Sequence, residues 1–299
     1  MSERKVPSPA RAYALLTGGA FFISFSPILV KLVGDGTVGL TAIAFWRTLI
    51  GGAILFLLTA GYRKPLALPK SVYPWSALAG FMFFIDLFVW HRSIMYAGAG
   101  LSTILGNTQV FFTAILGYLI FRERLSYKFF VAAFLAIVGI VLLVGVFSAT
   151  HFSNVYIHGI IFGLITGVAY ASYLITLKHT GRREVKPDFL TFVAWTSLFS
   201  AIFLGIASIF ESGRFLPPTL YAWFILFLLA LIVQALGWWA IYSSLSYIEA
   251  SRAGLILLLQ PTLATDWGVI IFAEYLSISQ VAGAVVTLGA IYYGSTYKR

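Results

Sequence analysis

The segment with the greatest capacity for chemistry is the apolar stretch from 73 to 96, which contains FMFFIDLFVWHRSIMY. Asp86 lies near its middle, and Trp90 follows four residues later on the same face of a helix. An ionisable side chain deep in a membrane costs at least ~2.5–3.5 kcal/mol, so it should face a cavity or a partner. Asp86 is therefore a candidate contact for a substrate ammonium group or a proton, and a structural hydrogen bond to a neighbouring helix is the alternative. His91 is a further candidate because a histidine can titrate near neutral pH, although a histidine that serves only in packing is the commoner outcome.

Two opposite charges lie in other apolar stretches. Arg47 and Asp266 are expected at a similar depth, roughly 10–12 Å below one surface at ~1.5 Å per residue. Because that surface is the outer one, opposite charges at one depth predict an ion pair that closes the extracellular half of the protein. Pro261 removes a backbone hydrogen bond and predicts a kink near residue 257, where freed carbonyl groups would bind substrate or the bent helix would act as a gate. A kink without a role in gating is the alternative.

Further polar and aromatic side chains fall within the apolar stretches, where they are candidates for the wall of a substrate cavity. Aromatic walls suit aromatic or aliphatic substrates, but packing between helices explains each aromatic residue equally well. These candidates are Asn107, Gln109, Tyr170, Tyr173, Gln234, Trp238, Trp239, Tyr242 and Gln260, of which Gln234, Trp238 and Tyr242 form one stripe at intervals of four.

Membrane helices must position these residues. Of the 299 residues, 60% are hydrophobic and only 10% are charged, whereas a soluble domain carries roughly a quarter charged residues. The apolar residues come in blocks of about twenty, enough to cross ~30 Å of hydrocarbon. The sequence therefore predicts an all-α membrane protein with ten transmembrane helices, near residues 12–33, 39–61, 73–96, 100–121, 127–147, 156–178, 188–210, 219–247, 251–273 and 278–296.

The distribution of Lys and Arg predicts the orientation. With the N-terminus inside, sixteen of these residues fall in inner segments and only two, Lys31 and Arg214, in outer segments. By the positive-inside rule, both termini are expected to be cytoplasmic. This bias explains the net charge of +10 without a nucleic-acid partner. We expect a multi-pass protein of the bacterial inner (plasma) membrane, whose partners are the lipid bilayer and a small-molecule substrate; the oligomeric state stays open.

A sequence repeat divides the chain. Residues 96–126 and 247–277 share nine residue types at a single offset of 151, including a Tyr, a Gln and the motif Phe-x-Glu-x-Leu-Ser. The repeat predicts two units, 1–150 and 151–299, of five spans each. Because five is odd, the second unit must be inverted relative to the first, which is the construction of many secondary transporters.

The acidic residue of the repeated motif has a structural interpretation. Glu123 and Glu274 lie at the ends of spans. Together with Ser126 and Ser277 they are expected to cap the helix that comes next, because Ser is a preferred N-cap residue.

The two five-helix units, each entered through Tyr-x-x-Ala and ending in Phe-x-Glu-x-Leu-Ser, resemble the EamA unit of the drug/metabolite transporter superfamily. The segment AIAFWRTLIGGAILF around Arg47 is similar to the second helix of that family. The resemblance covers almost the whole chain. It implies a ten-helix exporter with a central cavity lined mainly by helices 1, 3, 4, 6, 8 and 9. Within the family the chain looks most like YddG-type exporters of aromatic and other amino acids.

The favoured function is a secondary transporter that exports small metabolites, above all aromatic and other neutral amino acids, by alternating access. No Walker motif, HExxH pair, GxGD aspartate or Ser/His dyad is present in the spans, so no enzyme activity, cofactor or metal site is predicted. A nucleotide-sugar or organophosphate antiporter would need several cationic residues in the cavity. A drug antiporter would need a deep acid, for which Asp86 could serve. A channel or a structural membrane protein is the alternative from a different class.

Overall fold

A computed structural model of the chain describes residues 8–33, 38–97, 99–144, 154–211, 213–273 and 277–295, and no strand occurs among them. Within this part of the chain, eight apolar helical segments of 20 to 29 residues are long enough to cross a membrane, and two shorter apolar helices cover Tyr127–Leu142 and Val281–Gly294. The prediction of an all-α fold is confirmed. The eight long and two shorter helices lie at the positions of the ten predicted spans, and the predicted boundary at 150/151 lies outside the described residues.

The helices of the first half succeed one another with short connections. Ser8 and Pro9 start the first of them: the Ser8 hydroxyl accepts a hydrogen bond from Arg11 N–H at 3.3 Å, and proline suits the first helical position. The helices are α1 (Pro9–Ser24), α2 (Ser26–Val33), α3 (Leu40–Gly61), α4 (Tyr73–Ala97), α5 (Ala99–Asn107), α6 (Gln109–Phe121) and α7 (Tyr127–Val144).

The second half has the same succession. Asp188 and Thr219 cap two of its helices, because their side chains accept hydrogen bonds from Leu190 N–H and Ala222 N–H. The elements are α8 (Asn154–Arg182), α9 (Phe189–Ser208), α10 (Leu220–Leu228), the π-helix η2 (Leu229–Gly237), α11 (Trp238–Leu245), α12 (Ala250–Leu257), α13 (Leu259–Phe272) and α14 (Ile278–Ser295).

Two spans are broken next to a proline. The first span breaks at Phe25, two residues before Pro27, and the ninth predicted span breaks at Leu258, three residues before Pro261. Because proline has no N–H to donate to the carbonyl four residues earlier, the helix opens just before it. The break at Leu258 agrees with the kink predicted near residue 257.

A third break has no proline, and its cause is in the side chains. Between α5 and α6, the Asn107 amide donates to the carbonyl of Thr103 at 2.7 Å and the Thr108 hydroxyl donates to the carbonyl of Leu105 at 2.5 Å. Such local side-chain bonds compete with the helical backbone pattern. At the repeat offset of 151, Thr108 corresponds to Leu259, so this break and the break at Leu258 lie at nearly the same place in the two repeated segments.

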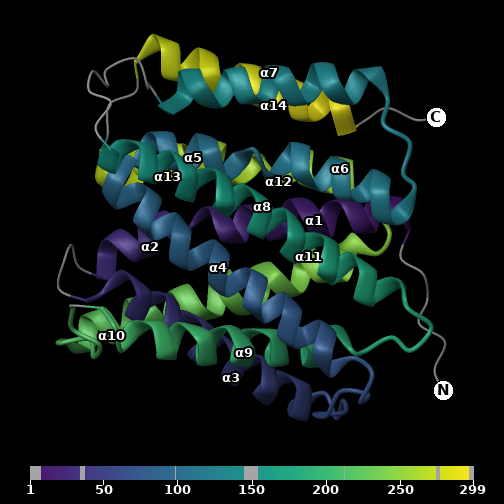
Figure 1. The fold of residues 1–299 in the computed structure, drawn as a ribbon, viewed down its shortest axis with the longest axis vertical. Helices are drawn as coiled ribbons and strands as arrows, with labels where there is room; N and C mark the ends of the chain where they lie inside the picture. Colours follow the sequence, from purple (N-terminus) through teal and green to yellow (C-terminus); the bar gives the residue numbers. More distant parts are fainter. Residues whose placement is uncertain are drawn as a thin grey trace.

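The helices of the two halves interleave (Figure 1). The most extensive contacts join α4 to α8, α7 to α14 and α3 to α9, so each pair takes one helix from each half. Helix α1 begins and helix α14 ends on the right-hand side of Figure 1, which we call the terminal end of the bundle. Helices α6 and α8 also end there, whereas α2, α4 and α13 end at the other side, the opposite end.

The contact of α7 with α14 depends on the absence of a side chain at Gly139. A Cβ atom there would lie 2.8 Å from both Gly283 O and Thr287 N and would also meet the Thr287 hydroxyl. The Gly139→Ala substitution should therefore force the two helices apart and lower the free energy of unfolding by about 1–3 kcal/mol. Thermal unfolding in detergent measures this. In the control, Gly289→Ala, the added Cβ meets nothing within 4 Å, and equal melting temperatures for the two variants would contradict the prediction.

Candidate functional site

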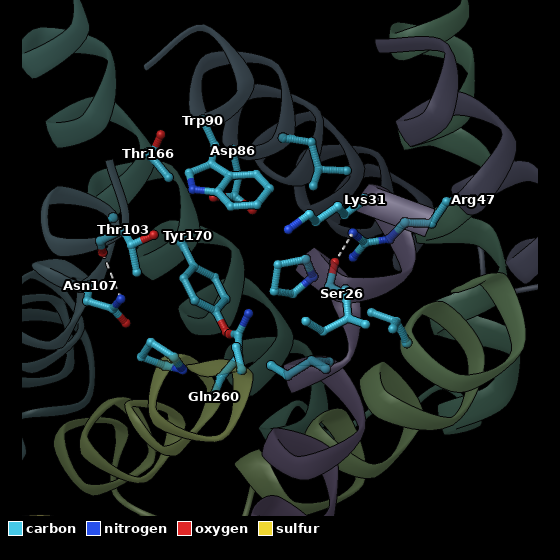
Figure 2. Close-up of a pocket in the computed structure, with 18 of the residues that line it drawn as sticks. Ser26, Lys31, Arg47, Asp86, Trp90, Thr103, Asn107, Thr166, Tyr170 and Gln260 are labelled. Carbon is cyan, nitrogen blue, oxygen red and sulfur yellow. Dashed lines mark hydrogen bonds between the residues drawn. The ribbon is translucent and has the colours of Figure 1, made fainter. Parts of the chain in front are cut away.

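A cavity of about 480 Å³ lies between helices of the two halves. Its wall comes from α1 to α5 in the first half and from α8, η2, α11 and α13 in the second half. Figure 2 shows polar and aromatic side chains that converge on it from several directions. All three helix breaks border the cavity, through Ser26 and Pro27, Asn107, and Gln260 and Pro261.

Helix α4 contributes an acid and an aromatic ring. Asp86 and Trp90 are separated by four residues, so they project from the same side of α4, and both line the cavity. Among the described residues, none forms a hydrogen bond or an ion pair with the Asp86 carboxylate. The carboxylate is therefore available to a ligand in the cavity.

Arg47 of α3 is buried, with 6% of its surface exposed, and it lines the cavity from the other side. Its Nε donates to Gln234 Oε1 at 3.2 Å, and its Nη1 donates to the Ser26 hydroxyl at 3.1 Å. The guanidinium carbon also lies 5.6 Å from the centre of the Phe83 ring. These contacts fix the orientation of the charged group.

The π-helix η2 provides the main support for Arg47. Its Gln234 side chain accepts from Arg47 and donates through Nε2 to the Ser197 hydroxyl at 2.9 Å. Gly51 of α3 leaves the necessary room, since a Cβ at this position would lie 2.5 Å from Gln234 Cγ. Single π-helical turns are frequent at functional sites. Here the irregular segment brings an amide into contact with a buried charge.

Aromatic rings form much of the remaining wall. Tyr170 lies 5.9 Å from Trp238, ring centre to ring centre, and both line the cavity. Phe83 lines it as well and packs 5.1 Å from Trp238. Tyr173 lies behind this layer, stacked on Phe83 at 4.8 Å, and its own surface is fully buried.

The structure brings only some of the predicted residues to the cavity. Those that line it are Arg47, Asp86, Trp90, Asn107, Tyr170, Trp238, Gln260 and Pro261. Those that do not line it are His91, Gln109, Tyr173, Gln234, Trp239, Tyr242 and Asp266.

The residues away from the cavity have identifiable surroundings. Gln109 donates to the carbonyl of Gly254 at 3.1 Å and so joins α6 to α12. His91 is buried beside Trp90, with ring centres 5.3 Å apart. Tyr242 packs against Phe192 of α9 at 4.9 Å. Within the predicted stripe, η2 interrupts the α-helical period between Gln234 and Trp238. Tyr242 lies one turn beyond Trp238 on α11, outside the cavity wall.

The predicted ion pair between Arg47 and Asp266 is not formed. Among the described residues, the partners of Arg47 are Gln234, Ser26 and Phe83, and Asp266 is not in contact with it. The prediction used depth alone, and depth does not fix the direction in which a side chain projects from its helix.

Four polar cavity residues were missed from the sequence: Ser26, Lys31, Thr103 and Thr166. Ser26 and Lys31 lie in and beyond the proline break of the first span, and both line the cavity. The Lys31 ammonium lies 4.2 Å from the centre of the Phe272 ring at the wall. Lys31 was used only as evidence for orientation; the signal that could have identified Ser26 and Lys31 is the Ser-Pro pair within a long apolar span.

A second group of buried charges, which we call the latch, lies at the terminal end. Lys178 Nζ is 2.9 Å from Glu123 Oε1, and the two side chains are 2% and 8% exposed. Glu123 Oε2 accepts from Ala250 N–H at 2.7 Å, and Lys178 also donates to the carbonyl of Ile248. The latch therefore joins the end of α6 to α8 and to the turn between α11 and α12.

The latch corrects one expectation about the repeated motif. Ser126 does cap α7, since its hydroxyl accepts from Phe129 N–H at 3.2 Å. Glu123, however, caps α12 in the other half of the molecule, where a negative charge is favourable at the helix N-terminus. The equivalent Glu274 lies outside the described residues.

Comparison with known proteins agrees with this architecture. A 200-residue stretch is 26% identical to a probable amino-acid metabolite efflux pump of Salmonella typhimurium and spans 65% of this chain and 66% of that protein, just under two thirds of each. An uncharacterized transporter of Clostridium kluyveri is 24% identical over 97% of this chain and 94% of its own length. The pseudopaline exporter CntI of Pseudomonas aeruginosa is 22% identical over 91% of each chain.

A solved crystal structure has the same fold. It matches with a TM-score of 0.83 over 96% of this chain and 97% of the other, at 15% identity. The sequence profile of the EamA-like transporter family matches residues 10–145 and again residues 157–296. The resemblance seen in the sequence is thereby confirmed, and the chain belongs to the EamA-like transporter family of multi-pass membrane proteins.

Proposed function

We propose that the protein is a secondary transporter that exports amino acids, aromatic and other neutral ones in particular, by alternating access. The observation that carries this proposal is the cavity of about 480 Å³ between the two halves, with one acidic side chain, two cationic side chains and aromatic rings in its wall. Small-molecule sites commonly occupy roughly 300–1,000 Å³, with mostly apolar walls and a few polar groups that orient the ligand.

We also propose that the chain has ten transmembrane helices arranged as two inverted repeats. Two matching backbone features support this at the offset of 151: Arg122 and Ala273 both have positive φ, 55° and 53°, and their N–H groups donate to Gly117 and Gly268 respectively. A helix end with this left-handed conformation is a common C-cap.

A reciprocal contact gives independent support for the inverted repeat. The indole N–H of Trp46 on α3 donates to the carbonyl of Phe215 at 2.8 Å, and that of Trp195 on α9 donates to the carbonyl of Leu66 at 2.9 Å. Each half therefore anchors a loop of the other half through a tryptophan in its own second predicted span, α3 or α9. Such an exchange is expected of two related units around a pseudo-two-fold axis.

The positive-inside rule supports placing the terminal end in the cytoplasm, and the bacterial relatives support an inner-membrane location. In that orientation the latch closes the cytoplasmic end. The cavity lies toward the outside, since Lys31 and Phe272 of its wall are near the outer ends of α2 and α13. A cavity at one end and a buried charged contact at the other support a carrier with one closed side, in preference to a channel.

The names of the relatives support the class of substrate. One relative is a probable amino-acid metabolite efflux pump and another is a pseudopaline exporter. An organophosphate antiporter is less well supported, because the described wall offers Arg47 and Lys31 as cations but also the acid Asp86. A drug antiporter would favour a cavity whose charge is acidic, and Arg47 argues against that.

Counterflow into liposomes that contain only this protein tests the proposed function. Saturable exchange of labelled Phe, Trp or Leu is the expected result. Exchange of phosphorylated metabolites or cationic drugs, with no amino-acid transport, would overturn the substrate assignment. Flux that does not saturate would favour a channel.

Substitution of Trp90 should reduce transport selectively. Trp90 lines the cavity, so Trp90→Ala is expected to raise the half-saturating concentration of an aromatic amino acid roughly tenfold, and that of alanine much less. The matched control is Trp239→Ala, since Trp239 is half-buried outside the cavity. A similar effect of both substitutions would show that Trp90 acts only through packing.

Release of the latch should expose the cytoplasmic side. In Lys178→Met, Glu123 loses its charged partner and the contact between α6, α8 and the α11–α12 turn weakens. Because the chain contains no cysteine, a single Ala253→Cys substitution in α12 reports accessibility without a background. A membrane-impermeant maleimide added to the cytoplasmic side should label this buried position several-fold faster when the latch is broken.

The control for this experiment breaks an ion pair whose cation is exposed to solvent. Lys64 and Asp188 lie 3.4 Å apart, and the Lys64 side chain is 48% exposed. Exposed pairs contribute only about 0–1 kcal/mol, so Lys64→Met should leave the labelling rate unchanged. An unchanged rate in Lys178→Met as well would remove the latch from the gating scheme.

A further inference from the structure

Three charged side chains line the cavity, and two of them, Arg47 and Asp86, carry opposite charges without contacting each other; the third, Lys31, lies over the Phe272 ring. Arg47 lines the cavity from α3 and Asp86 from α4, and no hydrogen bond or ion pair joins them in the described structure. Figure 2 shows the guanidinium group on one side of the cavity and the acid, behind Trp90, on the other. Opposite charges in an apolar interior attract strongly and usually pair. Here the cavity keeps them apart.

Each of these charged groups has unused hydrogen-bonding capacity. A guanidinium group has five N–H donors, and Arg47 commits one to Gln234 and one to Ser26, which leaves three. No described residue accepts a hydrogen bond from these three donors, although Arg47 is only 6% exposed. The planar guanidinium edge has the geometry that binds a carboxylate through two parallel bonds.

The support around Arg47 indicates that its orientation is set for a ligand. Gln234 and Ser26 are neutral, so they hold the guanidinium group without cancelling its charge. A structural arginine would be expected to pair with the acid available on the neighbouring helix. Asp86 remains without such a partner on the other side, which leaves two complementary charges for a ligand to satisfy together.

We propose that the cavity is a receptor for a zwitterion: Arg47 binds the carboxylate of the substrate, Asp86 binds its ammonium group, and Gln234 is a positioning residue that orients Arg47. The side chain of the substrate then lies against Trp90 and Tyr170. This inference rests on the proposed function and narrows it to molecules that carry both a free carboxylate and a free amine. Amines, organic acids and amino-acid amides are excluded as good substrates.

A series of competitors with one side chain tests the inference. Counterflow of labelled L-phenylalanine in liposomes is measured with unlabelled L-phenylalanine, phenethylamine, 3-phenylpropionate and L-phenylalaninamide as competitors. In the wild-type protein each of the last three, which lacks one charge, should compete roughly tenfold or more weakly than L-phenylalanine, since a charged hydrogen bond is lost.

Variants at the two charges should change selectivity in opposite ways. In Arg47→Met, the preference for L-phenylalanine over phenethylamine should fall at least roughly tenfold, while its preference over 3-phenylpropionate stays. In Asp86→Asn, the preference for L-phenylalanine over 3-phenylpropionate should fall, and the preference for L-phenylalanine over phenethylamine should stay. A ratio of competitors in one protein preparation does not depend on how much protein is folded.

Two further variants keep the test decisive. If Arg47→Met does not fold, Gln234→Glu places a negative charge beside Arg47 in nearly the same shape and should also abolish the preference for the carboxylate. The matched control is Arg92→Met, since Arg92 lies on α4 outside the cavity and pairs with Glu211 at 2.5 Å. It should leave all ratios unchanged.

The outcomes separate the inference from the proposed function. If wild-type protein carries L-phenylalanine but the amine or the acid competes equally well, the zwitterion receptor is wrong and the amino-acid exporter stands. If no amino acid is carried while another class of solute is, the proposed function fails. If Arg47→Met and Arg92→Met change the ratios to the same extent, Arg47 is not the carboxylate-binding group.

Discussion

Inside a membrane a helix has no water to hydrogen-bond with, so any departure from regular geometry must find its polar partners within the protein. In this chain the departures gather around one place. The breaks at Phe25, Thr108 and Leu258 and the π-helix that carries Gln234 all border or support the cavity. The remaining helix pairs, such as α7 with α14, are regular and pack through small residues. The apolar scaffold thus concentrates irregular backbone where a polar ligand would sit.

The two buried charge clusters have different characters. The latch is internally complete: Glu123 and Lys178 pair, and their remaining atoms reach backbone groups of Ala250 and Ile248. Two charged groups of the cavity are incompletely paired, since Arg47 is held by neutral groups and no described residue forms a hydrogen bond or an ion pair with Asp86. A complete cluster stabilises one closed arrangement, and an incomplete cluster is suited to exchange its partners with a solute.

Much of the fold was predictable from the sequence, because lipid imposes a simple pattern of long apolar segments. The break beside Pro261 was also predictable, since the missing donor has a fixed position. The site was only partly predictable: Asp86, Trp90 and Tyr170 were placed at the cavity wall, but Gln234 was not separated from Trp238 because no sequence rule signalled the π-helix. Asp266 was misjudged for a related reason, as depth in a span does not give the direction of a side chain. Lys31 was overlooked because it was used only as evidence for orientation.

The π-helix has a consequence for how such a protein can change. An α-helix turns by about 100° per residue, so the loss of one residue between 229 and 237 would restore a regular helix and rotate α11 relative to α10. Trp238 would leave the wall and a neighbour would replace it, whereas the packing of α10 would stay as it is. Deletion of a single codon in this segment could therefore change the residues that line the cavity, and with them the substrate, while the fold stays the same.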